Sequence, residues 1–196
     1  MKTAIFFLLD DYADWEGAYL SSTLNKKEDW IVKTASTQRE VTSIGGFTTK
    51  IDFLMDELPK QIDLFIMVGG NSWGLENKSL FTLVKNYLEG EVTVGAICGA
   101  VDYLARNGLL NNHKHTGNSL YLWESFENYT NGANFMEQQA VRDQQLVTAN
   151  GTAPNEFTKL ILEAIEFDST EVIEKTMYMN QYGFYNYCEK YGNPFF

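Results

Sequence analysis

The sequence predicts a three-layer α/β sandwich, in which a mostly parallel β-sheet carries helices on both faces. Short apolar runs alternate with segments of helical periodicity along most of the chain. Several of these runs are apolar without a break, which is typical of parallel strands whose two faces are both covered. Repeated strand–helix–strand units with right-handed crossovers assemble into this architecture.

The first half of the chain supplies strands, one helix and a hairpin. TAIFFLL is predicted to be a central strand, and ADWEGAYLSSTLN a helix with Trp15, Ala18 and Tyr19 on one face. DWIVKTAST is predicted to be the second strand. β-Branched residues around Gly45-Gly46 predict a hairpin. LPKQIDLFIMVGG holds the next apolar strand, which ends in two glycines.

The second half begins with KSLFTLVKNYLEG, an amphipathic helix. In EVTVGAICGAVDYLARNGLL a strand ends at Cys98 and a helix follows at once. ANFMEQQAVRDQQLVTAN predicts a strand pair, and PNEFTKLILEAIEF a helix with Pro154 in its first turn. We expect one domain over residues 1–167 and an aromatic-rich extension over residues 168–196 that packs on it. The extension is expected to cover an apolar surface of the domain or of a dimer mate, with a lid over the active site as the alternative.

The composition limits the classes of partner. A net charge of −11 argues against nucleic acid, which proteins bind through Lys and Arg, and against anionic membrane surfaces. Cys98 and Cys188 cannot form a disulfide framework, which favours a reducing compartment. No run approaches the ~20 apolar residues of a membrane span. The opening MKTAIFFLLDD meets two aspartates too soon for a signal peptide. We therefore expect a cytoplasmic protein.

Three separate segments are predicted to meet at one edge of the sheet. Ligands of open parallel sheets lie beyond the carboxyl ends of the strands, where Cys98 and Gly70 stand and Glu16 follows nearby. A helix N-terminus favours the thiolate form of a cysteine, and the small neighbours of Cys98 fit the tight turn of a nucleophile elbow. The N–H groups of Gly70 and Gly99 are expected to serve as oxyanion donors. The alternative is a cysteine that packs as a small hydrophobe.

Five motifs stand in the order and spacing of a known family: LLDDYADWE, MVGG, AICGAVDYLARNGLL, HTGN and LVTANGTAPNEF. Together they resemble the ThiJ/PfpI superfamily of flavodoxin-like proteins, related to class I glutamine amidotransferases, over roughly residues 1–167. The resemblance implies that Cys98 is the nucleophile, that the Glu16 carboxyl group touches its sulfur, and that the protein is a homodimer. An ionised Glu16 would raise the thiol pKa, so we expect a buried, protonated Glu16 that donates a hydrogen bond to the thiolate.

The family histidine is missing from its usual places. Protease-like and amidotransferase-like members carry it directly after the cysteine, where this chain has Gly99, and the places that other members use hold Asn118 and Asn134. His115 is left as a possible general base, although on an extended strand it points opposite to Asn118. Amide hydrolysis needs a proton for the leaving nitrogen, usually from a histidine, so peptidase and amidotransferase activities receive weaker support.

The leading hypothesis is a cysteine-dependent enzyme, hydrolase-like or glyoxalase-like, that acts on a small carbonyl or amide compound. A non-catalytic redox or stress-response protein whose Cys98 is oxidised is the alternative, and a cysteine peptidase or amidotransferase-like hydrolase is the second one. We expect no cofactor, and no metal, because His113 and His115 have no third ligand fixed beside them. Trp73, after the glycine pair, is expected to line the pocket, whereas Trp15 is at least as well explained as a core residue.

Overall fold

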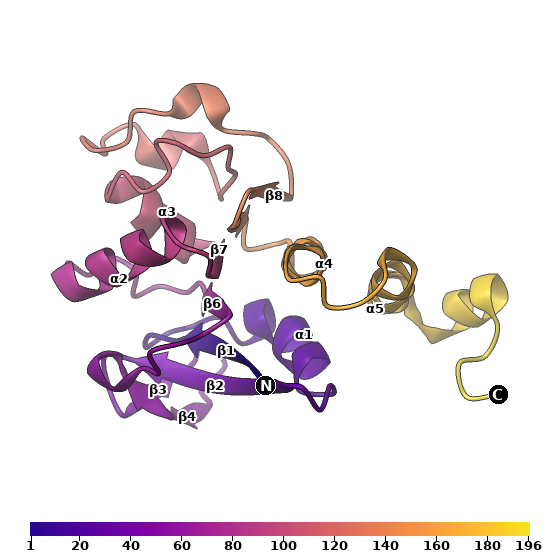
Figure 1. Cartoon of the computed structure of the whole chain (residues 1–196). Helices are drawn as coiled ribbons and strands as arrows, with labels where there is room; N and C mark the ends of the chain where they lie inside the picture. The colour runs from indigo at the N-terminus through magenta and orange to yellow at the C-terminus, as the bar shows by residue number, and fades with distance from the viewer.

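A computed structural model describes residues 1–196 and has a seven-stranded sheet at its centre, with the strand order β5-β2-β1-β6-β7-β9-β8 (Figure 1). All neighbouring strands are parallel except β8 and β9. The predicted mostly parallel α/β fold is therefore confirmed. The strands of this sheet are β1 (Lys2–Phe7), β2 (Trp30–Ser36), β5 (Phe53–Leu54), β6 (Leu64–Met67), β7 (Thr93–Ile97), β8 (Ala140–Asp143) and β9 (Leu146–Ala149).

Helices cover both faces of the sheet, because successive side chains of the buried strands point to opposite sides. Ala4 and Phe6 of β1 pack in one core cluster with residues of α1 and α4, and Ile5 and Phe7 pack in the other with residues of α2 and α3. The helices are α1 (Asp14–Leu24), α2 (Lys78–Leu88), α3 (Gly99–Arg106), α4 (Pro154–Ala164) and α5 (Thr170–Tyr191), with short 3-10 turns η1 (Met55–Glu57), η2 (Leu120–Trp123) and η3 (Gly132–Asn134).

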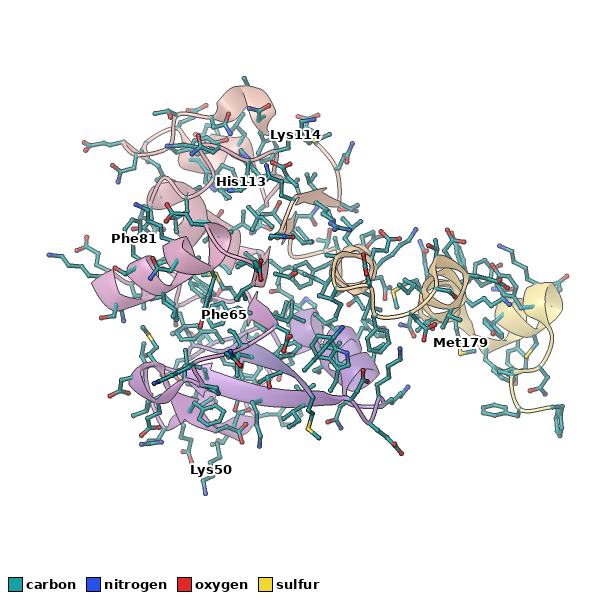
Figure 2. The ribbon with its side chains drawn as sticks, viewed as in Figure 1. Lys50, Phe65, Phe81, His113, Lys114 and Met179 are labelled. Carbon is teal, nitrogen blue, oxygen red and sulfur yellow. The ribbon has the colours of Figure 1, made fainter.

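The contrast between interior and surface is visible in the side chains. Phe65 on β6 lies in the interior, where its ring packs against that of Tyr87 on α2, whereas Lys50 extends into solvent (Figure 2). Lys50 ends the hairpin of β3 (Glu40–Thr42) and β4 (Thr48–Lys50), which forms where the sequence predicts it. The predicted strand pair before α4 is also present, as β8 and β9.

Helix α1 buries a different face from the one predicted. Trp15 and Tyr19 are exposed, whereas Glu16, Leu20 and Leu24 are buried. These three residues are spaced by four and therefore form one stripe along the helix. Leu20 and Leu24 pack against the sheet, and the stripe carries the carboxyl group of Glu16 to the carboxyl ends of the strands. The prediction that Trp15 and Tyr19 lie on the packed face of this helix is therefore wrong.

The aromatic extension packs on the domain only through its first half. Ile173 and Met177 of α5 are buried against the cluster that includes α4. At Gly183 the backbone takes a φ of +84°, which kinks the helix, and the second half of α5 lies at the far end of the molecule from α3 (Figure 1). Tyr185 is 87% exposed. The second half therefore neither covers the domain nor closes over the Cys98 end of the sheet. None of the helices combines the length and apolarity that crossing a membrane requires.

Candidate active site

Cys98 occupies a sharp turn between β7 and α3. Its backbone has φ 58° and ψ −127°, values that side-chain-bearing residues rarely adopt, and α3 begins at the next residue. The turn is held in place because the Cys98 N–H donates to the carbonyl of Ala149 on β9, at 3.0 Å. A strained strand-to-helix turn of this kind presents a side chain at the edge of the sheet. The Cys98 side chain is half-buried there and forms no disulfide.

Glu16 brings a buried carboxyl group next to this cysteine. The residue is 1% exposed, and neither carboxyl oxygen has a partner at hydrogen-bond distance and angle. Both residues lie against Gly69: a Cβ built there would be 2.2 Å from Glu16 Oε2 and 2.5 Å from Cys98 Cβ. Burial raises the pKa of Glu16 to about 7, and the nearby Cys98 thiol and Gly69 N–H lower it by less. Glu16 is therefore largely protonated below neutral pH.

Asn118 and Gly151 complete the surroundings of the sulfur. The Asn118 Nδ2 group donates to Cys98 Sγ at 3.4 Å, and Asn118 Oδ1 accepts from the Gly151 N–H at 2.9 Å. The Gly151 carbonyl accepts from the indole nitrogen of Trp15 at 3.4 Å. Four segments that are distant in the sequence thus meet around one thiol.

The thiol itself does not ionise easily. Burial raises the pKa of Cys98, hydrogen bonds from Asn118 and the Gly99 N–H lower it, and a charged Glu16 raises it again. The sequence had suggested a lowered pKa from the N-terminus of α3. Burial outweighs that effect, because Gly69 and Gly151 lie directly against the Cys98 side chain. Cys98 and Glu16 therefore titrate as one coupled pair, in which a single negative charge is tolerated much better than two.

Gly70 and Gly99 lie against each other beside the cysteine. A Cβ built at Gly99 would be 2.5 Å from the Gly70 carbonyl oxygen, so the two backbones are in close contact. The Gly99 N–H is the first of α3 and lies close enough to the Cys98 sulfur to lower the pKa of the thiol. Both predicted oxyanion donors thus lie at the cysteine end of the sheet.

His115 is not brought to the cysteine. It is fully buried, its Nδ1–H donates to the His113 carbonyl at 2.8 Å, and its Nε2 lies 2.7 Å from the Tyr129 hydroxyl. Its ring packs against the rings of Trp123 and Phe135. Burial lowers its pKa and keeps the ring neutral.

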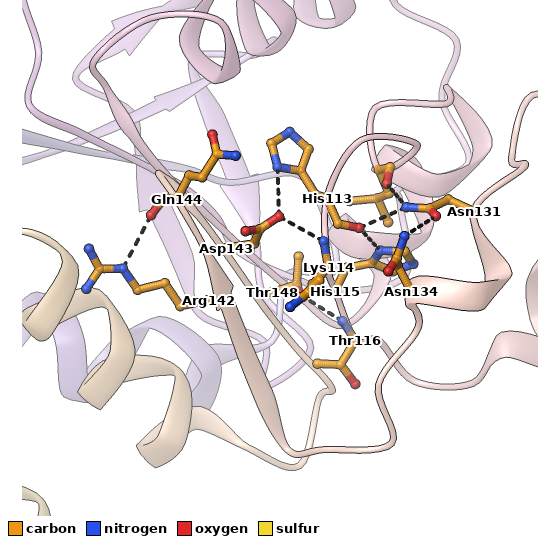
Figure 3. Close-up of polar contacts among 11 residues, drawn as sticks. His113, Lys114, His115, Thr116, Asn131, Asn134, Arg142, Asp143, Gln144 and Thr148 are labelled. Atoms are coloured by element: carbon orange, nitrogen blue, oxygen red, sulfur yellow. Dashed lines mark hydrogen bonds and ion pairs between the residues drawn. The ribbon is translucent and has the colours of Figure 1, made fainter.

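The same polar cluster contains His113 and Asn134, the second of which stands at one of the family's histidine positions (Figure 3). His113 Nδ1 lies 3.6 Å from Asp143 Oδ2, and Asn134 Nδ2 donates to Asn131 Oδ1 at 2.7 Å. Of the family's alternative positions, only that of Asn118 contacts the sulfur. An amide side chain cannot accept a proton at neutral pH, so it cannot replace a histidine as a base.

Trp73 is buried and Trp15 is exposed, which is the reverse of what the sequence predicts. Trp73 is 3% exposed, its Nε1 donates to the Val68 carbonyl at 2.8 Å, and its ring packs against Phe7 and Tyr103. It is a core residue, because the loop after β6 turns inward under α3. Trp15 is 49% exposed and contacts Gly151. Trp73 therefore does not line a pocket, and Trp15 is the tryptophan on the surface beside the Gly151 loop.

No three or more His, Cys, Asp or Glu side chains gather in a way that could hold a metal ion.

The role of Gly151 was missed in the sequence. It follows β9, which pairs with β7, so the rule that placed Cys98 and Gly70 at the carboxyl ends of parallel strands would have placed Gly151 beside them.

Comparison with known proteins fits this arrangement. The model of the DJ-1/PfpI family matches residues 2–164. The chain belongs to the DJ-1/PfpI family. It is 57% identical over 195 residues to a Bacillus subtilis protein named "Uncharacterized protease YdeA", with 100% of this chain and 99% of that protein covered. It is 33% identical over 192 residues to "Uncharacterized protease YoaZ" from the same species, with 92% and 91% covered.

A solved structure places the whole fold in the DJ-1/PfpI family. The thiJ/pfpI family protein from Bacillus anthracis is 31% identical, covers 92% of both chains and superposes with a TM-score of 0.86. The family match ends at residue 164, where α4 ends. The extension that contains α5 therefore lies beyond the family model, although the match to YdeA spans it.

Proposed function

We propose that this DJ-1/PfpI protein is an enzyme that uses Cys98 as a nucleophile toward a small carbonyl or amide compound, with Glu16 controlling the proton of the thiol. The observation that carries the proposal is the position of Glu16: a carboxyl group without a hydrogen-bond partner, 1% exposed, beside a thiol on a strained turn. Burying such a group costs several kcal/mol unless it is neutral. A protein that needed only packing here would place an apolar side chain.

Glu16 is the group that can accept the thiol proton. Its pKa of about 7 lies below that of the thiol, so the pair releases its first proton near neutral pH, mainly from Glu16. When substrate arrives, the proton moves from Sγ to the Glu16 carboxylate. The resulting thiolate accepts a hydrogen bond from Asn118, and the protonated Glu16 then has its expected role as a neutral hydrogen-bond donor.

The simplest reaction at this site is addition to an aldehyde. The thiolate forms a carbon–sulfur bond to the carbonyl carbon, and the electron pair of the C=O π bond moves to oxygen. The N–H groups of Gly70 and Gly99 are proposed to donate to that oxyanion. Glu16 returns its proton to the oxygen, so that thiol and aldehyde give a hemithioacetal with no other reactant.

The test uses methylglyoxal as the probe aldehyde. We expect it to protect Cys98 reversibly from alkylation by iodoacetamide, as hemithioacetal formation requires. Consumption of more than one equivalent by wild-type protein but not by Cys98→Ser would show that the adduct reacts further. Cys188→Ser serves as the matched control and should behave like wild type. Protection without consumption would limit the chemistry to reversible addition. Equal alkylation of Cys98 with and without methylglyoxal would refute the proposal for aldehydes.

Redox sensing is the second candidate, and the absence of a histidine at the sulfur favours it. Peptide hydrolysis, which the names of the Bacillus subtilis relatives suggest for those proteins, needs an acid for the leaving nitrogen, and His115 is engaged elsewhere. Oxidation has no such need: the thiolate attacks one peroxide oxygen, the O–O bond breaks, and hydroxide leaves as the sulfenic acid forms. This alternative would be supported if hydrogen peroxide oxidised Cys98 faster than Cys188 and the protein turned over no carbonyl or amide compound.

We also infer a homodimer, as is common among members of the family. Sedimentation of the full chain at micromolar concentration tests this inference.

A further inference from the structure

We propose that Gly151 is a positioning residue, which fixes the amide of Asn118 so that its NH2 group faces Cys98, while Trp15 holds the Gly151 peptide in place. This inference rests on the proposed use of Cys98 as a nucleophile. It gives Gly151 and Trp15 a role that neither the motifs nor the pairing of Cys98 with Glu16 assigns to them.

The first step is the asymmetry of an asparagine side chain. One end of the amide is an acceptor and the other is a donor. Asn118 Oδ1 accepts from the Gly151 N–H at 2.9 Å, so its Nδ2 is the end that reaches Cys98 Sγ, at 3.4 Å. If the amide turned over, two N–H donors would meet at Gly151 and an oxygen would face the sulfur. The Gly151 N–H therefore selects the orientation that stabilises a thiolate.

The second step is the close approach of Gly151 to the reacting pair. A Cβ built at this position would lie 2.8 Å from Cys98 Sγ and 3.0 Å from Glu16 Oε1. Contacts this short force a displacement, so only glycine can bring its N–H to Asn118 while leaving the sulfur and the carboxyl group in place. The requirement at this position is for the absence of a side chain.

The third step is the fixing of the loop that carries Gly151, residues 150–153. The Trp15 indole N–H donates to the Gly151 carbonyl at 3.4 Å. On the other side, Asn150 Oδ1 accepts from the Thr152 N–H at 3.0 Å, and the Ala153 N–H donates to the Asn150 carbonyl at 3.1 Å. Trp15 is adjacent to Glu16 on α1, so one helix positions both the carboxyl group and the loop.

The consequence is a donor to the sulfur whose strength does not change with pH. An amide does not titrate in the range where the Cys98–Glu16 pair does, so Asn118 supports the thiolate at every pH at which it forms. The pH dependence of the thiol then belongs to the pair alone.

The experiment measures the second-order rate constant for iodoacetamide alkylation of Cys98 from pH 5.5 to 10, in the full-length protein. In Asn118→Asp the side chain still accepts from the Gly151 N–H but cannot donate to the sulfur once ionised. We expect the midpoint of the alkylation rate against pH to rise by at least one pH unit in this variant. Gly151→Ala should lower the rate at pH 7.5 by at least tenfold. Trp15→Phe keeps the ring and loses the N–H, and should lower the rate about threefold. Tyr19→Phe, one turn along α1, is the control and should match wild type.

The outcomes separate this inference from the proposed function. If wild-type Cys98 reacts no faster than Cys188, the proposed function fails, and this inference fails with it. If wild-type Cys98 is reactive but Asn118→Asp and Trp15→Phe give the wild-type profile, the positioning role is refuted and the nucleophile stands. Urea unfolding of each variant checks the fold. Should Gly151→Ala unfold, the midpoint of the pH profile of Asn118→Asp decides whether the positioning role stands.

Discussion

Replacing Glu16 by glutamine should change how stability depends on pH. The pKa of Glu16 is about 7 in the folded protein, against 4.5 for an ordinary glutamate. Between these two values the folded chain keeps a proton that the unfolded chain has released. The free energy of unfolding therefore falls as the pH rises through this window, and the stabilisation by the protonated form is complete only below about pH 4.5.

The size of the effect follows from the same shift. A raised pKa of this extent corresponds to about 3 kcal/mol at pH 8, at roughly 1.4 kcal/mol for each pH unit. For a chain of this length, that amounts to roughly 6–12 °C in melting temperature. Between pH 5 and pH 8 the wild-type protein should lose most of this free energy, whereas Glu16→Gln, which cannot ionise, should keep it.

Urea unfolding at half-unit steps from pH 5 to pH 9 measures the difference. Glutamine has nearly the same shape but a different polarity, so the comparison is between slopes against pH and not between absolute stabilities. Glu127→Gln, at an exposed carboxyl group, is the matched control and should follow the wild-type slope. Wild type and Glu16→Gln losing stability in parallel would refute the argument that Glu16 is buried as an acid.

Three further predictions concern other parts of the chain. The pKa of His115 is lowered by burial, so the free energy of unfolding should fall as the pH drops below about 6.5. His115→Gln should lose less of this free energy than wild type when urea unfolding at pH 5 is compared with urea unfolding at neutral pH. Cys98→Gly should be more stable than Cys98→Ala by about 1 kcal/mol, because glycine adopts the φ of 58° without strain; equal unfolding midpoints would contradict this. Removing residues 184–196, which follow the Gly183 break, should change the free energy of unfolding of the remaining chain by less than about 1 kcal/mol, and a larger loss would mean that the extension packs on the domain.

The sequence was sufficient to predict the sheet and to bring the candidate site residues to one edge of it. Cys98, Gly70 and Glu16 could be brought together because the carboxyl ends of parallel strands share one edge of a sheet. The period-2 geometry of an extended segment also separated Asn118 from His115 correctly. Both arguments use repeating backbone geometry, which the order of apolar runs is enough to predict.

The sequence was insufficient where a side chain's environment depends on loops. Trp73 follows a glycine turn, which suggested exposure, but the loop folds inward and buries it. Trp15 seemed suited to the core and is half-exposed because Glu16 takes the buried stripe of α1. The direction of the Cys98 pKa failed for the same reason: the effect of a helix N-terminus can be read locally, but the burial that exceeds it comes from Gly69 and Gly151.

The two free cysteines give the molecule an internal reference. Cys98 stands on the strained turn, whereas Cys188 lies beyond the kink in α5, on the part of the chain that leaves the body (Figure 1). A reagent added to the protein meets both thiols at one concentration and for one duration. At low conversion, the ratio of the two labelled fractions in a mass spectrum therefore reports the reactivity of Cys98 relative to Cys188 without a separate calibration of dose or time. The same ratio can be taken in intact cells, where the concentration of an electrophile is not known.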